Sequence, residues 1–112
     1  MKEIMAYIKP HKLPDVTAVL RNVDGLTGMS VIDCRGFGVG RGVGAEDPEG
    51  GDFDFRKVVK IEVICHERHV DEVTAAIESA AHTGLKGDGK IYVGEISHAV
   101  RISTGESGED AV

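Results

Sequence analysis

The chain has 112 residues, a formal net charge of -6, 41% hydrophobic residues and 29% charged residues. This length and composition indicate one domain, residues 1–112, that can bury its own core. The acidic balance excludes a general nucleic-acid binder, which needs a basic face. No apolar run is long enough to span a bilayer, and the charged start at Lys2 and Glu3 is unlike a signal peptide, so we expect a cytoplasmic protein.

The N-terminal part alternates strand and helix patterns. The short apolar run 4–8 predicts a buried strand, which ends before Pro10 because proline cannot donate a ladder hydrogen bond. A helix is expected from Pro14, a residue that suits a first turn, to Val23, because apolar residues recur on one face. The β-branched residues within 29–35 predict a second strand.

Residues 36–56 form a long segment in which glycine occupies nearly every other position of the first half. Such a segment within a small domain is expected to be a flexible loop with a functional role. Its second half is acidic, which fits either a solvated linker or a surface for a basic partner.

The C-terminal part repeats the strand–helix–strand order. Residues 57–66 alternate in hydrophobicity, 70–82 have helical spacing, and 91–93 predict a last strand. The expected fold is therefore α+β, a ferredoxin-like βαββαβ unit with an antiparallel sheet and two helices on one face. Because apolar residues occur on both faces of these strands, we expect the second face to be buried by oligomerisation. The tail, 104–112, is small and acidic and is expected to be mobile.

A glycine-rich stretch, residues 83–91, lies between the second helix and the last strand. Three glycines and two lysines let the backbone approach a ligand and turn N–H groups toward an anion. The stretch is not a Walker loop, because Ile91 stands where Ser or Thr would hold magnesium and because it leads from a helix into a strand. A simple turn is the alternative.

Over essentially its whole length the sequence resembles the PII signal-transduction family. No single motif is decisive, but the combination is specific. The motifs are Ile8-Lys9-Pro10, Gly28-Met29-Ser30-Val31, Arg35-Gly36-Phe37-Gly38, Val59-Lys60-Ile61-Glu62, Gly87-Asp88-Gly89-Lys90-Ile91 and Arg101-Ile102-Ser103-Thr104-Gly105-Glu106.

The resemblance implies a homotrimer that binds adenine nucleotides (ADP, AMP or ATP) in clefts between subunits. It assigns the phosphates to the glycine stretch with an arginine, the closing of the site to the root of the long loop, and the adenine to an apolar slot. The implied residues are Gly87, Asp88, Gly89, Lys90 and Arg101 for phosphate, Gly36, Phe37 and Gly38 for closure, and Gly28, Met29, Ser30 and Ile64 for adenine.

Several departures from the family pattern bear on function. Residues 36–56 contain no Tyr, Ser, Thr or Lys, so the loop has no ordinary acceptor for a nucleotidyl or phosphoryl group. Val39-Gly40 replaces the Arg-Gln that would help to hold magnesium and 2-oxoglutarate, and Lys57 is the nearest substitute for a displaced lysine. Ser103 replaces the second arginine of the pair that begins at Arg101. We expect a preference for ADP or AMP, or poor discrimination, and no response to 2-oxoglutarate.

The implied function is that of a regulator rather than an enzyme. Nucleotide binding would change the 36–56 loop, including Phe53 and Phe55, and so its contact with a target such as a membrane transporter or metabolic enzyme. The alternatives are a metal- or small-anion-responsive trimer and a slow nucleotide hydrolase. His66 and His69 lack a third metal ligand at suitable spacing, and Cys34 and Cys65 are interpreted as buried free thiols.

Overall fold

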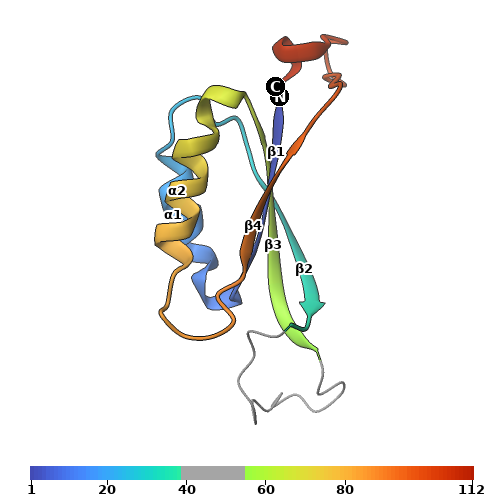
Figure 1. Ribbon diagram of the computed structural model, residues 1–112. Coiled ribbons are helices and arrows are strands. Elements are labelled where there is room, and N and C mark those ends of the chain that lie inside the picture. Colours follow the sequence, from blue (N-terminus) through green and yellow to red (C-terminus); the bar gives the residue numbers. More distant parts are fainter. Residues whose placement is uncertain (39–54) are drawn as a thin grey trace.

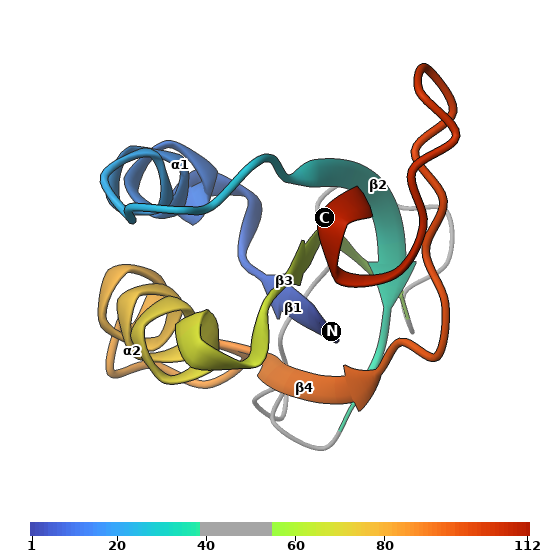
Figure 2. The same cartoon turned by 90° about the horizontal axis from the view of Figure 1, so that it is seen from above.

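The structure, a computed structural model, describes residues 1–38 and 55–112. Four strands form an antiparallel sheet in the order β2-β3-β1-β4, and two helices lie together on one face of it (Figure 1, Figure 2). This confirms the ferredoxin-like α+β fold. The elements are β1 (Lys2–Ile8), α1 (Leu13–Arg21), β2 (Ser30–Gly36), β3 (Arg56–Cys65), α2 (Val70–Ala81) and β4 (Lys90–Glu95), with short 3-10 helices at Pro10–Lys12, Glu67–His69 and Gly108–Ala111.

The element boundaries differ from the sequence expectation mainly at strand ends. β1 begins at Lys2 rather than Ile4, and β4 reaches Glu95. Lys2 and Glu3 interrupt the apolar pattern of the sequence, which is why the sequence predicts a strand that begins at Ile4. Their backbone groups nevertheless continue the hydrogen-bond ladder, because the ladder does not depend on side-chain polarity. Lys2 pairs with Cys65 of β3 and with Glu95 of β4, so β1 is extended from both sides.

The core lies between the sheet and the helices. Alternate residues of the two central strands face α1 and α2, because side chains of a strand point to opposite faces in turn. Thirteen buried apolar residues form this cluster, and the largest that are fully buried come from β1, β3 and both helices. They are Ile4, Leu20, Ile61, Ile77, Val16, Val63, Val73 and Cys65.

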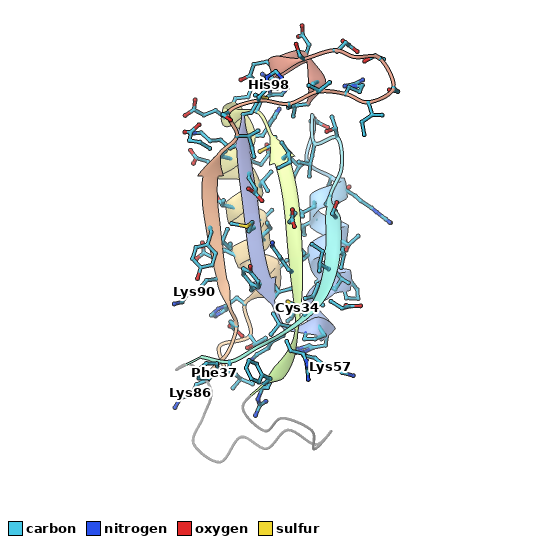
Figure 3. The ribbon with its side chains drawn as sticks, turned by 90° about the vertical axis from the view of Figure 1, so that its right-hand side faces the viewer. Cys34, Phe37, Lys57, Lys86, Lys90 and His98 are labelled. Carbon is cyan, nitrogen blue, oxygen red and sulfur yellow. The ribbon has the colours of Figure 1, made fainter. Side chains whose placement is uncertain are left out.

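The opposite face of the sheet is only partly covered. It carries Met5 and Tyr7 of β1 beside the Lys60–Glu62 ion pair of β3, whose N–O distance is 3.2 Å. Ile32 on one edge strand and Tyr92 on the other keep 41% and 48% of their surface exposed. Among residues 1–38 and 55–112, no segment covers this open face (Figure 3).

No helix in the described ranges, 1–38 and 55–112, is both long and apolar enough to cross a membrane.

The C-terminal segment folds back on the start of the chain. A hairpin is closed by the Val100–Ser107 bridge, and the Gly108–Ala111 helix follows it. Glu109 accepts a hydrogen bond from the N-terminal amine of Met1 at 3.1 Å and lies 2.6 Å from Nδ1 of His66. The expected mobility of 104–112 stays a prediction, and these are the contacts that such motion would break.

We expect Glu109→Gln to loosen this tail. The His66 imidazole, and next the N-terminal ammonium, hold the pKa of Glu109 below its ordinary value. The contribution of this carboxylate to stability is therefore complete above about pH 4.3 and is lost as the pH falls through the lower folded-state pKa. Amide exchange of residues 108–111, followed by NMR, should accelerate roughly two- to fivefold, as for loss of an exposed ion pair.

Asp110→Asn is the matched control for this experiment, because the Asp110 carboxylate makes no ion pair within the described residues. Its tail amides should exchange as in the wild type. Acidification should loosen the wild-type tail and leave the Glu109→Gln tail nearly unchanged. Equal exchange in the two variants would contradict the anchoring role of Glu109.

Candidate functional site

The glycine stretch forms a loop between α2 and β4 whose shape depends on left-handed backbone positions. Gly84, Gly87 and Gly89 have φ angles of 80°, 84° and 97°. These values are in the region that L side chains avoid because Cβ meets the backbone. These three glycines shape the connection between Ala81, the last residue of α2, and Lys90, which begins β4.

Gly89 is the most constrained position of the loop. A Cβ placed there would lie 1.6 Å from the backbone oxygen of Tyr7 and 2.8 Å from its carbonyl carbon. The end of the loop therefore packs directly on the backbone of β1, where Tyr7 pairs with Lys90. Only glycine permits this approach.

The side chain of Asp88 organises the loop from inside. Its Oδ2 accepts hydrogen bonds from the backbone N–H of Thr83 at 2.8 Å and of Gly84 at 3.3 Å. Its Oδ1 accepts from the Thr83 hydroxyl and lies 3.1 Å from Nζ of Lys9. These contacts, first those of Thr83 and then that of Lys9, hold the pKa of Asp88 well below its usual range. The Asp88 carboxylate faces the loop interior rather than a ligand.

Lys9 is a residue that the sequence analysis did not assign to the site. It directly follows β1, and its Nζ also donates to Oγ1 of Thr83 at 3.1 Å. The fold topology could have indicated Lys9. In a ferredoxin-like fold the end of β1 lies beside the start of β4, and therefore beside the loop that leads into β4.

The outer side of the loop is positively charged. Lys86 and Lys90 are exposed, and neither has an ion-pair partner in the described part of the chain. Figure 3 shows Lys86 at the same end of the sheet as Phe37 and Lys57, with Lys90 at the adjoining edge. The backbone N–H groups of Thr83, Gly84 and Leu85 donate within the loop, to Asp88 and to the Thr83 hydroxyl. An anion approaching this end would therefore meet the two exposed lysine ammonium groups, which suit a phosphate.

The root of the 36–56 segment lies at this same end. Gly36 pairs with Arg56, the first residue of β3. Phe37, which is 72% exposed, contacts Phe55 edge to face with ring centroids 5.8 Å apart. Phe53 and the acidic residues expected at the loop tip lie outside the described residues.

A shallow hollow of about 340 Å³ lies beside the loop, between the end of α2 and strands β1 and β4. Its floor is apolar, with Ile8, Ile77 and Ala81, and Lys90 stands at its rim. The residues expected around adenine, 28–30 and Ile64, do not line it. The hollow is therefore distinct from the slot that the sequence analysis expected.

The expected site residues fall into two groups at opposite ends of the sheet. The first group contains the loop residues 87–90 and the loop root 36–38. The second contains the hairpin with Arg101 and Ser103, together with residues 28–30 and Ile64. Because β2 runs from Ser30 to Gly36, these two residues are roughly 20 Å apart along the strand. Figure 1 shows the hairpin at the end where β1 begins and the glycine loop at the other.

The hairpin presents its side chains outward. Arg101 is held by its own segment, with Nη1 4.0 Å from Oε1 of Glu106 and Nη2 donating to the backbone oxygen of Asp110 at 3.5 Å. Ile102 beside it is 100% exposed. Seen along the sheet, the hairpin projects away from the helix layer (Figure 2). Arg101 therefore cannot complete the site of its own chain at the distant glycine loop.

Comparison with known proteins identifies the family of this chain. A family model described as "Nitrogen regulatory protein P-II" matches residues 1–106. The chain belongs to the P-II family. Proteins named nitrogen regulatory protein P-II from Pasteurella multocida, Bradyrhizobium diazoefficiens and Azospirillum brasilense are 45%, 46% and 45% identical to it, each over 114 aligned residues and 100% of both chains. The resemblance drawn from the motifs is confirmed, and with it a regulatory role in signal transduction.

The histidines and cysteines of this P-II protein form no metal site within the described residues. Within 1–38 and 55–112 no group of three or more His, Cys, Asp or Glu side chains could hold a metal, and His66 contacts Glu109. Both cysteines are free, and burial raises the pKa of the Cys65 thiol, whereas Cys34 is half-buried. Of the departures from the P-II pattern, Ser103 is exposed in the hairpin, and Val39 and Gly40 lie outside the described residues.

Proposed function

We propose that this P-II protein is a cytoplasmic, non-enzymatic regulator that binds ADP, AMP or ATP in clefts between the subunits of a homotrimer. It signals through residues 36–56 to a protein target such as a membrane transporter or a metabolic enzyme. The observation that carries the proposal is the glycine loop, whose single carboxylate is neutralised from within while two lysines remain exposed on it.

The loop has the properties of a phosphate site. Its backbone takes left-handed turns at Gly84, Gly87 and Gly89, and glycine at these positions lets a ligand approach the backbone closely. Lys90 supplies a positive charge at the edge of the sheet. Asp88 is the loop carboxylate that could orient a water for hydrolysis, but it is turned inward, which favours binding over catalysis.

Separation of the two groups of site residues supports a cleft between copies. Arg101 and the adenine-side residues cannot reach the glycine loop of the same chain, whereas a neighbouring copy can bring them there. The open face of the sheet, with exposed Tyr92 and Ile32 beside the Lys60–Glu62 ion pair, is the surface that such an assembly would bury. The projecting hairpin, with its exposed Ile102, is the element that reaches toward the neighbour.

The loop root provides a link between nucleotide and target. Gly36 ends β2, and residues 36–38 are part of the proposed site, so a nucleotide that contacts them contacts the start of the 36–56 segment. A ligand shifts the population of a segment when it binds one conformation better than another. The edge-to-face contact of Phe37 with Phe55 ties the two ends of the segment together and is the contact that such a shift would change.

Arg101 and Ser103 bear on the choice of nucleotide. A single guanidinium remains where the resemblance implies two, and each charge-assisted hydrogen bond contributes about 1.5–3 kcal/mol. The outer phosphate of ATP is the group that would lose a partner. We therefore propose a preference for ADP or AMP, and no dependence on 2-oxoglutarate.

Calorimetric titration of the purified protein with AMP, ADP, ATP and adenosine tests this function. Each nucleotide is titrated with and without magnesium and 2-oxoglutarate, and the oligomeric state is measured by light scattering. ADP or AMP should bind to a trimer at least about tenfold more tightly than adenosine, because the loop recognises phosphate. 2-Oxoglutarate should leave these affinities unchanged.

Two results would contradict parts of the proposal. Magnesium-dependent ATP binding that 2-oxoglutarate strengthens would overturn the inferred effector preference while keeping the site. An absence of heat with every nucleotide would overturn nucleotide binding itself. A response to inorganic phosphate alone would then identify the loop as a small-anion site.

A further inference from the structure

We infer that Lys9 is a positioning residue for nucleotide phosphate: it holds Asp88 and Thr83 in the arrangement that keeps the glycine loop open to an anion. Lys9 itself does not contact the ligand. This inference rests on the proposed function, because it assigns to Lys9 a part in the binding of phosphate by that loop.

The contacts of Lys9 connect β1 to both ends of the loop. Nζ lies 3.1 Å from Oδ1 of Asp88 and 3.1 Å from Oγ1 of Thr83. The side chains of Lys9 and Asp88 are only 21% and 23% exposed. A long and otherwise flexible lysine is thus held between Asp88 and Thr83, largely screened from solvent.

The Thr83 hydroxyl is fully used in this arrangement. A threonine hydroxyl has one donor and two acceptor positions. Oγ1 donates to Asp88, accepts from Nζ of Lys9, and accepts from the backbone N–H of Leu85 at 3.1 Å. Removing Lys9 leaves one acceptor position of Oγ1 empty and takes the ammonium away from Asp88, which keeps Nδ1 of His82 at 3.5 Å as a basic neighbour. The turn at residues 83–85 then loses its anchor on β1.

The charge of Asp88 explains why the anchor has to be a cation. Phosphate approaches a loop that contains a carboxylate, and like charges at short distance repel. Lys9 balances this carboxylate, which leaves the positive charge of Lys90 to act on the ligand. Without Lys9 the Asp88 carboxylate loses its neighbouring ammonium, so the net charge around the loop becomes more negative by one unit.

If Lys9 positions the glycine loop, its removal should weaken binding of the phosphate groups and not of adenine. Loss of Lys9 should weaken the binding of ADP more than that of AMP and should leave adenosine nearly unaffected. A substitution that merely disturbed the fold would weaken all three ligands to a similar extent. The pattern across ligands therefore separates positioning of phosphate from general damage.

Calorimetric titration of Lys9→Met, Lys9→Arg and Lys12→Met with ADP, AMP and adenosine tests the inference. Lys12→Met is the matched control, because it removes a lysine three residues from Lys9. The ion pair of Lys12 with Asp15 is exposed. Lys9→Met should weaken ADP binding about tenfold or more, the value of one charge-assisted contact. Lys9→Arg should recover most of this loss, and Lys12→Met should change ADP affinity by less than about twofold.

A second variant tests the charge argument and remains informative if Lys9→Met does not fold. Lys9→Met combined with Asp88→Asn carries no unbalanced carboxylate, and the asparagine oxygen can still accept from the Thr83 N–H. This double variant should bind ADP more tightly than Lys9→Met, or within about tenfold of the wild type where the single variant is unfolded.

Outcomes against the inference are distinct from failure of the proposed function. ADP binding by Lys9→Met equal to that of Lys12→Met would overturn it, as would equal losses for ADP and adenosine. A double variant that binds ADP more weakly than Lys9→Met, or not at all, would also overturn it. In each case the wild type still binds ADP, whereas a wild type that binds no nucleotide would overturn the proposed function.

Discussion

Gly89→Ala is expected to abolish nucleotide binding and to destabilise the protein by about 3 kcal/mol or more. The new Cβ would lie 1.6 Å from the backbone oxygen of Tyr7, and the φ angle of 97° disfavours any L side chain. Relief requires the start of β4 to move away from β1, which breaks the pairing of Tyr7 with Lys90. Lys90 would move with it, so phosphate binding and stability should fall together.

Gly87→Ala is the comparison that isolates the clash. Its φ angle of 84° is similar, but a Cβ there would meet only Cε of Lys9 at 3.8 Å, an ordinary contact. Backbone strain alone should cost about 1–2 kcal/mol. By thermal unfolding, Gly89→Ala should melt about 5 °C or more below Gly87→Ala. Equal melting temperatures would show that the approach to the Tyr7 carbonyl is not a constraint on this fold.

The second large effect concerns how the site is divided between copies. Lys90→Ala and Arg101→Ala should each weaken ADP binding roughly tenfold to a hundredfold, because each removes a charged partner of phosphate. If each cleft takes Lys90 from one copy and Arg101 from the next, a mixed assembly contains some clefts with both residues intact. Random mixing in equal amounts should restore wild-type affinity to about a quarter of the clefts.

The measurement is calorimetry on trimers formed by co-refolding the two variants. Its control is a mixture of Lys90→Ala with the Lys90→Ala, Arg101→Ala double variant, in which no cleft can be restored. A tight class of sites in the first mixture and none in the control would establish sites shared between copies. Titrations that merely average those of the two parents would place both residues in one chain, against the roughly 20 Å that separates Ser30 from Gly36 along the strand.

In the proposed regulator, short backbone segments connect the nucleotide site to the 36–56 segment that contacts the target. Asp88 and Lys9 shape the glycine loop from within, and residues 36–38 connect the same end of the sheet to the 36–56 segment. The proposed control is therefore conformational. This agrees with a segment that offers no Tyr, Ser, Thr or Lys as an acceptor for covalent modification.

Periodicity in the sequence was sufficient for the elements and the fold class. Val59, Ile61 and Val63 alternate because one face of β3 packs on helices, and the helical spacing of Val73 and Ile77 has the same cause. Glycines at 84, 87 and 89 indicated the loop because left-handed backbone requires them. Motifs spread over the chain indicated the family, since each is a local run of residues. All of these signals are local in sequence.

The sequence by itself thus determined the strands and helices, the family and the location of the glycine loop. The tertiary structure decided what the residues of that loop do. Lys9 meets Asp88 only because β1 and β4 are neighbours, so the contact joins residues that no local pattern connects. The extension of β1 to Lys2 and the anchoring of Glu109 at the N-terminal amine arise in the same way. Side-chain partners across a sheet are set by strand order and register, and those emerge only when the whole chain has folded.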